Sequence, residues 1–273
     1  MPARCRIISI IAYVIFNVGG FIPSANAQDS VLIVSAPKKI NTLGLRYDFT
    51  LLDKKGYKPW HLVSLEYTRG FKKFPLTARI NYANRFNLSG WQVEADAYPV
   101  LSKKIYAYLN AGYSPDKTVL PKYRAGFSLY LSLPAAYEAE AGLRYLYFNA
   151  ATFIYTGSVG KYYKNYWFNF SSFLTPAHGK VSGAYFLKTR YYLNDTDFIM
   201  LLLGTGISPD DKNNNIQFSN NNRMASKQAA LSLKRSLKKG SVILLGAGFT
   251  KQEYLPQMFM NQYNGSIGFQ KMF

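Results

Sequence analysis

Few residues of this sequence could act as a nucleophile or as a general acid or base. His61 lies close to Ser64 and Glu66, which makes these three the best local candidate for a hydrolase-type set. In an extended strand Ser64 and Glu66 share one face, whereas His61 falls on the other, so the three side chains do not converge. The second histidine, His178, lies just after a turn at Pro176. We therefore expect no catalytic site and a protein that is not an enzyme.

Metal and cofactor motifs are also absent from the sequence. No HExxH, P-loop, GxSxG or calcium-loop pattern is found. The run Asp210–Asn215 superficially resembles a cation-binding loop, but it lacks spaced carboxylates and a closing glutamate. The single cysteine, Cys5, lies close to the N-terminus, so the remaining chain offers no thiol. We expect no metal or other cofactor, and a solvated extracellular loop at Asp210–Asn215.

Charged residues that alternate with apolar ones are the other candidates for chemistry. Arg46 and Asp48 flank Tyr47, a spacing that places charges on one strand face and apolar side chains on the other. In a membrane barrel the charged face is the lumen, because a basic group facing mid-bilayer lipid costs roughly 2–4 kcal/mol. This phase selects as candidate lumen-lining residues Arg46, Asp48, Glu66, Arg79, Arg85, Glu94, Asp96, Arg124, Glu138, Glu140, Arg144, Lys188 and Arg190.

Two interpretations of this charged face stay open. Opposite charges on neighbouring strands can pair across the sheet and fill the lumen. Alternatively, the arginines line a polar pathway and guide an anionic solute or a glycan. The sequence defines the chemistry of the lumen but not its radius.

The elements that carry these residues are strands. Alternation with a period of two recurs in segments of roughly ten residues, which suits a tilted membrane strand better than a soluble one. About fourteen such segments can be placed, centred near Tyr47, Leu65, Ile80, Ala95, Leu109, Phe127, Gly142, Thr156, Phe170, Tyr185, Leu202, Leu231, Leu245 and Ile267. The sequence thus predicts an all-β protein: a single closed antiparallel transmembrane β-barrel of about 14 strands, with about 12 as the alternative.

The connections between segments support an even number of strands. If both termini are periplasmic, the connections from odd to even strands are extracellular and longer. The polar or irregular stretches Ser208–Arg223 and Gln252–Asn261 fall on that side. The short turns Leu101–Lys104 and Lys238–Gly240 fall on the other. The separate strand near Phe170 depends on a turn at Lys164–Asn165.

The N-terminal segment has the pattern of an export signal. Arg4 and Arg6 precede the apolar run Ile7–Val18, and Ala25–Ala27 supplies a small-residue cleavage site. No later stretch approaches eighteen consecutive apolar residues, the length expected of a membrane helix. We expect a cleaved signal peptide over residues 1–27, a periplasmic lead-in over residues 28–40 and a barrel over residues 41–273, located in the bacterial outer membrane.

The C-terminal segment is typical of the strand that closes an outer-membrane barrel. Gly268, Phe269 and the terminal Phe273 follow the amphipathic, aromatic-terminated pattern that the barrel-assembly machinery recognises. Lys271 departs from this pattern, because an apolar or aromatic residue is usual there. We predict the assembly machinery as a partner.

The charge of the chain is strongly basic, with a formal net charge of +19. No helix-turn-helix, zinc-finger or RNA-binding signature accompanies it, so we expect no nucleic-acid partner. Many lysines fall at predicted turns, namely Lys54, Lys55, Lys72, Lys73, Lys103, Lys104, Lys238 and Lys239. We predict that some of them face anionic headgroups of outer-membrane lipid or lipopolysaccharide.

From Trp60 to about Gly206 the chain resembles the YaiO family of outer-membrane β-barrels. The resemblance rests on several stretches in order: Leu65–Tyr67, Asn81–Phe86, Glu94–Pro99, Tyr106–Ser114, Pro121–Gly126, Gly142–Leu146 and Tyr155–Tyr162. It implies an outer-membrane barrel and little more, although some members resemble the barrel parts of polysaccharide-secretion systems.

Three functional hypotheses follow. The first is a non-enzymatic, porin-like pore, or an export or docking component, for a polar or anionic solute, a polysaccharide or another envelope glycan. The second is a lipid- or envelope-modifying enzyme. The third is a structural barrel that binds lipopolysaccharide without transport.

Overall fold

The computed structural model describes residues 41–54, 56–71, 74–116, 118–177, 180–210, 225–255 and 257–273. The expected signal peptide, the expected lead-in over residues 28–40, His178 and the part of the Asp210–Asn215 run after Asp210 lie outside the described residues. The first described residue, Asn41, already belongs to a strand.

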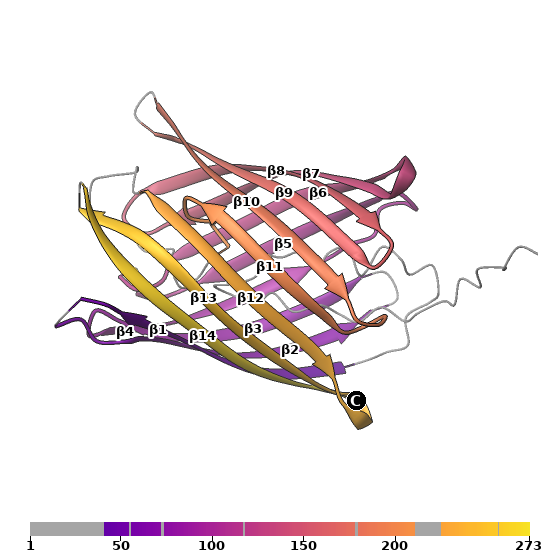
Figure 1. The fold of residues 1–273 in the computed structure, drawn as a ribbon, viewed down its shortest axis with the longest axis horizontal. Coiled ribbons are helices and arrows are strands. Elements are labelled where there is room, and N and C mark those ends of the chain that lie inside the picture. Colours follow the sequence, from indigo (N-terminus) through magenta and orange to yellow (C-terminus); the bar gives the residue numbers. More distant parts are fainter. Residues whose placement is uncertain are drawn as a thin grey trace, which may run out of the picture.

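The described chain forms one closed antiparallel barrel (Figure 1). Its fourteen strands are β1 (Asn41–Leu52), β2 (Trp60–Gly70), β3 (Pro75–Arg85), β4 (Leu88–Ala97), β5 (Ile105–Tyr113), β6 (Tyr123–Leu133), β7 (Tyr137–Tyr147), β8 (Ala151–Tyr163), β9 (Tyr166–Ala177), β10 (Lys180–Tyr192), β11 (Phe198–Thr205), β12 (Ser226–Ser236), β13 (Ser241–Leu255) and β14 (Met258–Met272). Each strand pairs with its neighbours in the chain, and β1 closes the barrel on β14 from Thr42↔Met272 to Leu52↔Gln262. The predicted fold class and strand number are confirmed.

The alternating sequence explains why these segments form this barrel. In β1 the even-numbered residues Thr42–Thr50 are buried or point inward, while Leu43, Leu45 and Leu51 are exposed. Successive side chains of a strand point to opposite faces, so one face meets the interior and the other meets the surroundings. Closure removes the free strand edges that a flat sheet would leave unpaired.

Tight turns join several of the strands. Phe86 and Asn87 both have positive φ and connect β3 to β4 through a two-residue hairpin, as a type I′ turn requires. Lys164, also at positive φ, turns the chain from β8 into β9, which confirms the separate strand near Phe170. The long connection after Ser208 lies between an odd and an even strand, as predicted.

One predicted loop is wrong. Gln252–Asn261 lies on the predicted extracellular side, but it is not a long irregular stretch, because β13 continues to Leu255 and β14 begins at Met258. Gln252 pairs with Met260, and a register shift lies between Glu253 and Leu255. Backbone pairing in this hairpin satisfies the polar groups that a loop would have left to solvent.

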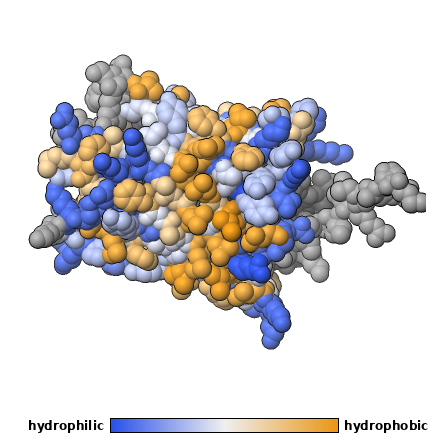
Figure 2. Space-filling view, in the orientation of Figure 1, coloured by the Kyte–Doolittle hydropathy of each residue, from blue (hydrophilic) through white to orange (hydrophobic). Residues whose placement is uncertain are grey.

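The outer surface carries a belt of apolar side chains around the middle of the barrel. Figure 2 shows this belt, with hydrophilic residues at both ends of the molecule. Exposed Leu, Ile, Phe and Tyr side chains on almost every strand contribute to it. Such a belt matches the hydrocarbon thickness that a barrel must cover. Among the described residues, no helix is long and apolar enough to cross a membrane.

The two ends of the barrel can be assigned from its connections. Asn41 and Phe273 exchange backbone hydrogen bonds, so both ends of the described chain lie at the same rim. The short turns Pro134–Ala136 and Lys238–Gly240 are at that rim, whereas the long connection from β11 to β12 is at the opposite one. Barrels of this type have short periplasmic turns and longer extracellular loops, so the rim with the termini is the periplasmic one.

Candidate functional site

The interior of the barrel is the candidate site, because the charged strand residues lie there. The structure places all the candidate lumen-lining residues on the inward face. Arg46, Asp48, Glu66, Arg79, Arg85, Glu94, Asp96, Arg124, Glu138, Arg144, Lys188 and Arg190 are buried, and Glu140 is partly buried. Buried charges are costly unless they are paired and hydrogen-bonded, so their partners decide what the interior can do.

The densest cluster of charges surrounds Arg79 in β3. Its Nε lies 3.1 Å from Oε2 of Glu66, and its Nη1 lies 2.9 Å from Oε2 of Glu94 and 3.0 Å from Oδ2 of Asp96. Glu66 and Glu94 stand directly opposite Arg79 on β2 and β4. The cluster therefore follows from strand register, because directly opposed side chains are the closest neighbours across a sheet.

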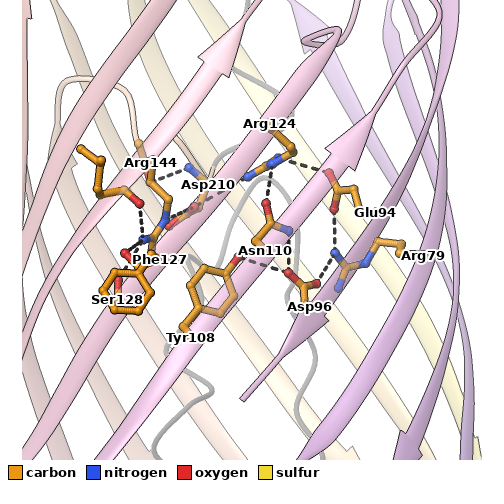
Figure 3. A network of polar contacts seen from close by, with 12 residues as sticks. Arg79, Glu94, Asp96, Tyr108, Asn110, Arg124, Phe127, Ser128, Arg144 and Asp210 are labelled. Carbon is orange, nitrogen blue, oxygen red and sulfur yellow. Dashed lines mark hydrogen bonds and ion pairs between the residues drawn. The ribbon is translucent and has the colours of Figure 1, made fainter. Parts of the chain in front are cut away.

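Polar contacts continue from this cluster to the next strands (Figure 3). Oδ1 of Asp96 accepts hydrogen bonds from Nδ2 of Asn110 at 2.6 Å and from the Tyr108 hydroxyl at 3.2 Å. Asn110 in turn accepts a hydrogen bond from Nε of Arg124 at 3.2 Å, and Nη1 of Arg124 lies 3.3 Å from Oε1 of Glu94. The result is one connected polar wall that extends from β2 to β7.

Two inward-facing glycines make room for the arginines of this wall. Gly112 pairs with Arg124, and Gly126 pairs with Arg144. A Cβ at Gly112 would lie 2.7 Å from Cγ of Arg124, and one at Gly126 would lie 3.0 Å from Cδ of Arg144. Each arginine side chain thus lies across the bare backbone of the preceding strand, where any larger residue would displace it.

The polar wall also holds the start of the longest connection. Asp210, five residues after the end of β11 at Thr205, is 7% exposed. Its Oδ1 accepts a hydrogen bond from Nε of Arg144 at 3.2 Å and lies 3.7 Å from Nη2 of Arg124 (Figure 3). The prediction of a solvated loop is therefore wrong at Asp210: the chain turns into the barrel there, because two inward arginines offer its carboxylate a partner that offsets desolvation.

A second connection also folds inward from the extracellular rim. Between β5 and β6, Val119 and Leu120 are buried against Leu62 and Ala83 on the inner faces of β2 and β3. Nε2 of Gln92 donates to the carbonyl oxygen of Pro121 at 2.8 Å and fixes the end of this segment. Sequence reasoning missed it; the adjacent apolar residues Val119 and Leu120 between two strands were the available signal.

Other candidate residues lie on different parts of the inner wall. Arg46 makes a bidentate pair with Asp48, with Nε at 2.7 Å from Oδ2. Glu138 accepts a hydrogen bond from the Tyr106 hydroxyl at 2.9 Å. Arg85 is buried near the extracellular end of β3, and Lys188 stands opposite Asn169.

Arg190 occupies an aromatic environment near the periplasmic end. Its guanidinium carbon lies 4.1 Å from the ring centre of Phe198 and 4.9 Å from that of Trp167. Its Nη1 donates to the Tyr192 hydroxyl at 3.0 Å. Cation–π contacts of this kind stabilise a charge that has left water.

An apolar cluster occupies part of the inner wall between β7 and β13, which the alternation rule did not predict. One cluster of buried side chains spans β7 to β13 and consists of Leu146, Ile154, Trp167, Phe173, Ala184, Phe186, Phe198, Met200, Leu202, Ala230, Val242 and Leu244. The run Phe198–Leu203 in β11 is apolar on both faces and was the signal available in the sequence. The interior therefore has a polar wall on β2–β7 and an apolar cluster on β7–β13, where buried polar residues such as Asn169, Ser171 and Lys188 lie between the apolar ones.

The hydrolase-type set considered from the sequence does not come together. Ser64 and Glu66 are buried inside, and the Ser64 hydroxyl donates to Oδ1 of Asn81 at 2.7 Å. His61 lies on the outer face, where its Nδ1 is 2.7 Å from the hydroxyl oxygen of Tyr47. The predicted opposite orientation of His61 is confirmed. In the described part of the chain, no group of three or more His, Cys, Asp or Glu residues could hold a metal ion.

The residues of the predicted assembly signal lie at the end of β14. Gly268 stands between Arg46 on β1 and Leu244 on β13. Phe269 and Phe273 are exposed, at 48% and 66%. Lys271 donates to the carbonyl oxygen of Lys239 in the preceding turn, at 2.6 Å. Recognition of these residues by the assembly machinery stays a prediction.

Solved structures of several outer-membrane proteins share this fold. A monoaromatic hydrocarbon channel, CymD, superposes with a TM-score of 0.57 and 9% identity, covering 96% of this chain and 94% of its own. The outer-membrane protein Omp33 of Acinetobacter baumannii gives 0.52 and 11%, covering 85% and 97%. A structure described as a bacterial polysaccharide outer membrane secretin gives 0.51 and 11%, also covering 85% and 97%. At such identities the likeness establishes the fold alone.

Comparison at the level of sequence gives the family. No curated protein sequence matches the chain. The model of the YaiO membrane beta barrel domain matches residues 40–211, more than half of the sequence and all of the polar wall. Together with the closed barrel and its apolar belt, this match shows that the chain is an outer-membrane β-barrel belonging to the YaiO family.

Proposed function

We propose that the protein is a non-enzymatic outer-membrane channel for small polar solutes, including sugars, and that two inward-folded connections narrow its lumen. The observation that carries this proposal is the contact of Asp210 with Arg124 and Arg144. It draws the connection that follows β11 against β6 and β7, on another part of the barrel wall. Ion pairs, unlike a covalent link or a packed domain, can release such a segment.

The balance of charge favours uncharged solutes over anions. Arg79, Arg124 and Arg144 each lie against carboxylates of the same wall. An anion that binds one of these arginines has to displace a buried carboxylate, which costs free energy on both sides. Hydroxyl groups of a neutral solute can exchange hydrogen bonds with the same wall without separating charges. The pairing of these arginines with carboxylates therefore argues against an anionic cargo.

The two-sided interior fits solutes that have both polar and apolar surfaces. A sugar ring presents hydroxyl groups at its edge and C–H groups on its faces. Binding sites for small molecules commonly combine apolar walls with a few fixed polar groups. The polar wall of β2–β7 and the apolar cluster of β7–β13 supply these two components. We extend the proposal from small sugars to the passage or docking of a polysaccharide. This extension is consistent with the fold shared with the polysaccharide secretin.

Planar-bilayer recording and liposome swelling test the proposal. We expect stepwise conductance with weak preference between small cations and anions, and swelling with neutral sugars that falls as their mass increases. Gluconate should enter no faster than a neutral sugar of equal size. The same measurements on Asp210→Ala cover the case in which the wild-type lumen is closed at rest. If neither protein conducts or admits any solute, the channel proposal is wrong; stabilisation by lipopolysaccharide in that case supports the structural barrel instead.

A further inference from the structure

The outer faces of β12 and β13 carry basic residues near the extracellular rim, unlike the other strands whose side chains are described. Outward residues in the middle of β12 are Ala229, Leu231 and Leu233, and those of β13 are Ile243, Leu245, Ala247 and Phe249. Directly beyond this apolar stretch, at the extracellular end, follow Lys227 on β12 and Lys251 on β13. Both lysines are exposed.

These two lysines face each other across the sheet. The register pairs Lys227 with Lys251 directly, so their side chains leave the wall side by side. Like charges directly opposite each other in a sheet are destabilising unless something neutralises them. The neighbouring positions in this row are Thr205 on β11 and Asn261 on β14, neither of which is charged.

Within the part of the chain that the structure describes, neither lysine makes an ion pair. The nearest carboxylate on the same face of β13, that of Glu253, instead accepts hydrogen bonds from the backbone N–H groups of Ala225 and Gln257. Nζ of Lys251 lies 5.1 Å from the ring centre of Phe259, which keeps the ammonium group near the barrel surface. Among the described residues, the pair is thus a site of doubled positive charge with no carboxylate bonded to it; the next carboxylate along the row, that of Asp53, accepts hydrogen bonds from Asn261.

The pair is distinctive because it lies near the extracellular rim. Other outward-facing basic strand residues whose side chains are described lie at the periplasmic rim, on four different strands: Arg69, Lys161, Arg235 and Lys271. Lys227 and Lys251 lie at the opposite boundary of the apolar belt, in the leaflet that holds lipopolysaccharide. The phosphate groups of lipid A lie at this depth, directly above its acyl chains.

We propose that Lys227 and Lys251 together bind a phosphate group of lipid A in lipopolysaccharide. The phosphate would supply a counter-charge to the pair, and the acyl chains would cover the exposed Leu231, Phe249 and Tyr263 below it. Each basic residue at an anionic membrane surface contributes about 1 kcal/mol. This site is independent of the proposed channel, because it lies on the outer face of the barrel.

The test compares lipid binding by two charge-matched double variants. Lys227→Gln/Lys251→Gln removes the site, and Lys238→Gln/Lys239→Gln removes the same charge from the periplasmic turn. Refolded proteins are titrated with lipid A in detergent, and bound lipid is counted by native mass spectrometry. Heat-modifiable migration on gels verifies that each barrel is folded.

We expect about thirtyfold weaker lipid A binding by Lys227→Gln/Lys251→Gln than by the wild type and no change for Lys238→Gln/Lys239→Gln. Dephosphorylated lipid A should bind the wild type as weakly as intact lipid A binds the first variant. Equal binding by both variants would overturn the proposal. Equal competition by phosphatidylglycerol vesicles or by inorganic phosphate would show a site for phosphate in general and would overturn the assignment to lipid A. Lys227→Gln/Lys251→Gln should keep the single-channel conductance of the wild type. This measurement tests the lipid site separately from the channel proposal.

Discussion

Oδ1 of Asp210 accepts a hydrogen bond from Nε of Arg144 at 3.2 Å, although 66 residues separate the two in the chain. Arg144 lies in β7 and Asp210 follows β11, so this bond crosses from one part of the barrel wall to another. Arg144 is held in place from the other side, because its Nη1 donates to the Ser128 hydroxyl at 2.8 Å and its Nη2 lies 3.6 Å from Glu140. A prepositioned guanidinium of this kind loses little entropy when it takes up the loop carboxylate.

Replacement of Asp210 by asparagine should release the β11–β12 connection. The substitution keeps the size of the side chain and removes the charge that Arg124 and Arg144 hold. We expect larger and more frequent current transitions in planar bilayers than with the wild type. Asp195→Asn, in the exposed periplasmic turn, is the matched control and should leave the currents unchanged. Identical currents in all three proteins would mean that Asp210 does not control the lumen.

Replacement of Arg79 by methionine should be strongly destabilising. It would leave Glu66, Glu94 and Asp96 buried around an apolar side chain. Removing one partner of a buried ion pair costs roughly 3–5 kcal/mol, so the urea midpoint of unfolding should fall clearly. Arg235→Met provides the comparison, since Arg235 is 55% exposed in its pair with Asp197 and should cost about 1 kcal/mol or less. Similar losses for the two variants would contradict the structural role of the Arg79 cluster.

A disulfide between positions 90 and 119 should lock the β5–β6 connection to the wall. A Cβ placed on Gly90 would lie 3.5 Å from Cβ of Val119, within the range of native disulfides. Because Cys5 is the only cysteine in the sequence, the double variant Gly90→Cys/Val119→Cys can be analysed without competing thiols in the barrel. We expect spontaneous oxidation, seen as a gel shift under non-reducing conditions, with conductance preserved. Thiols that stay reduced under oxidising conditions would show that this segment leaves the wall.

The periplasmic turn between β10 and β11 should lose stability in acid. Burial acts to raise the pKa of Asp197, but hydrogen bonds from Asn194, Ser236 and Thr196 outweigh it and hold the pKa below its usual value. A group with a lowered folded-state pKa contributes stability above its unfolded value and loses it as pH falls through the folded value. The contribution is therefore complete above about pH 5 and declines below about pH 4.

Asp197→Ala should accordingly unfold at lower urea concentration than the wild type at pH 7. The free energy of unfolding should fall by about 1–3 kcal/mol. The difference should shrink as the pH of the measurement is lowered below about 4. Asp195→Ala, two residues away and exposed, should show no such pH-dependent difference. A constant difference between Asp197→Ala and the wild type across this pH range would contradict the assigned role of the carboxylate.

The strand framework was accessible from the sequence because it depends on local periodicity. Every predicted strand centre, from Tyr47 to Ile267, falls inside an observed strand. The inward placement of Arg79 and its neighbours follows from the same alternation, since a charge in the lipid-facing series would be too costly. The loop predicted at Gln252–Asn261 is too long, because its residues alternate poorly in the sequence. Pairing between β13 and β14 nevertheless orders them.

The contents of the interior were accessible only in part. Alternation places Arg124 and Arg144 inside, but it does not reveal that Asp210 joins them from a distant connection. It also suggests a polar interior throughout, whereas Phe186, Met200 and Leu202 belong to an apolar cluster on part of the inner wall. Contacts of this kind depend on which strands closure brings near each other, and on how far a connection turns inward.

A closed, membrane-spanning β-barrel with charges on its inner face could be predicted from the sequence alone, because a two-residue period and the cost of charge in lipid act locally. Which charges meet depends on the folded barrel, because strand register brings Glu66, Arg79 and Glu94 into one row. The tertiary structure also decided that Asp210 is a buried partner of Arg144 and not a solvated loop residue, because the gain from an ion pair inside the barrel depends on a geometry that no single segment contains.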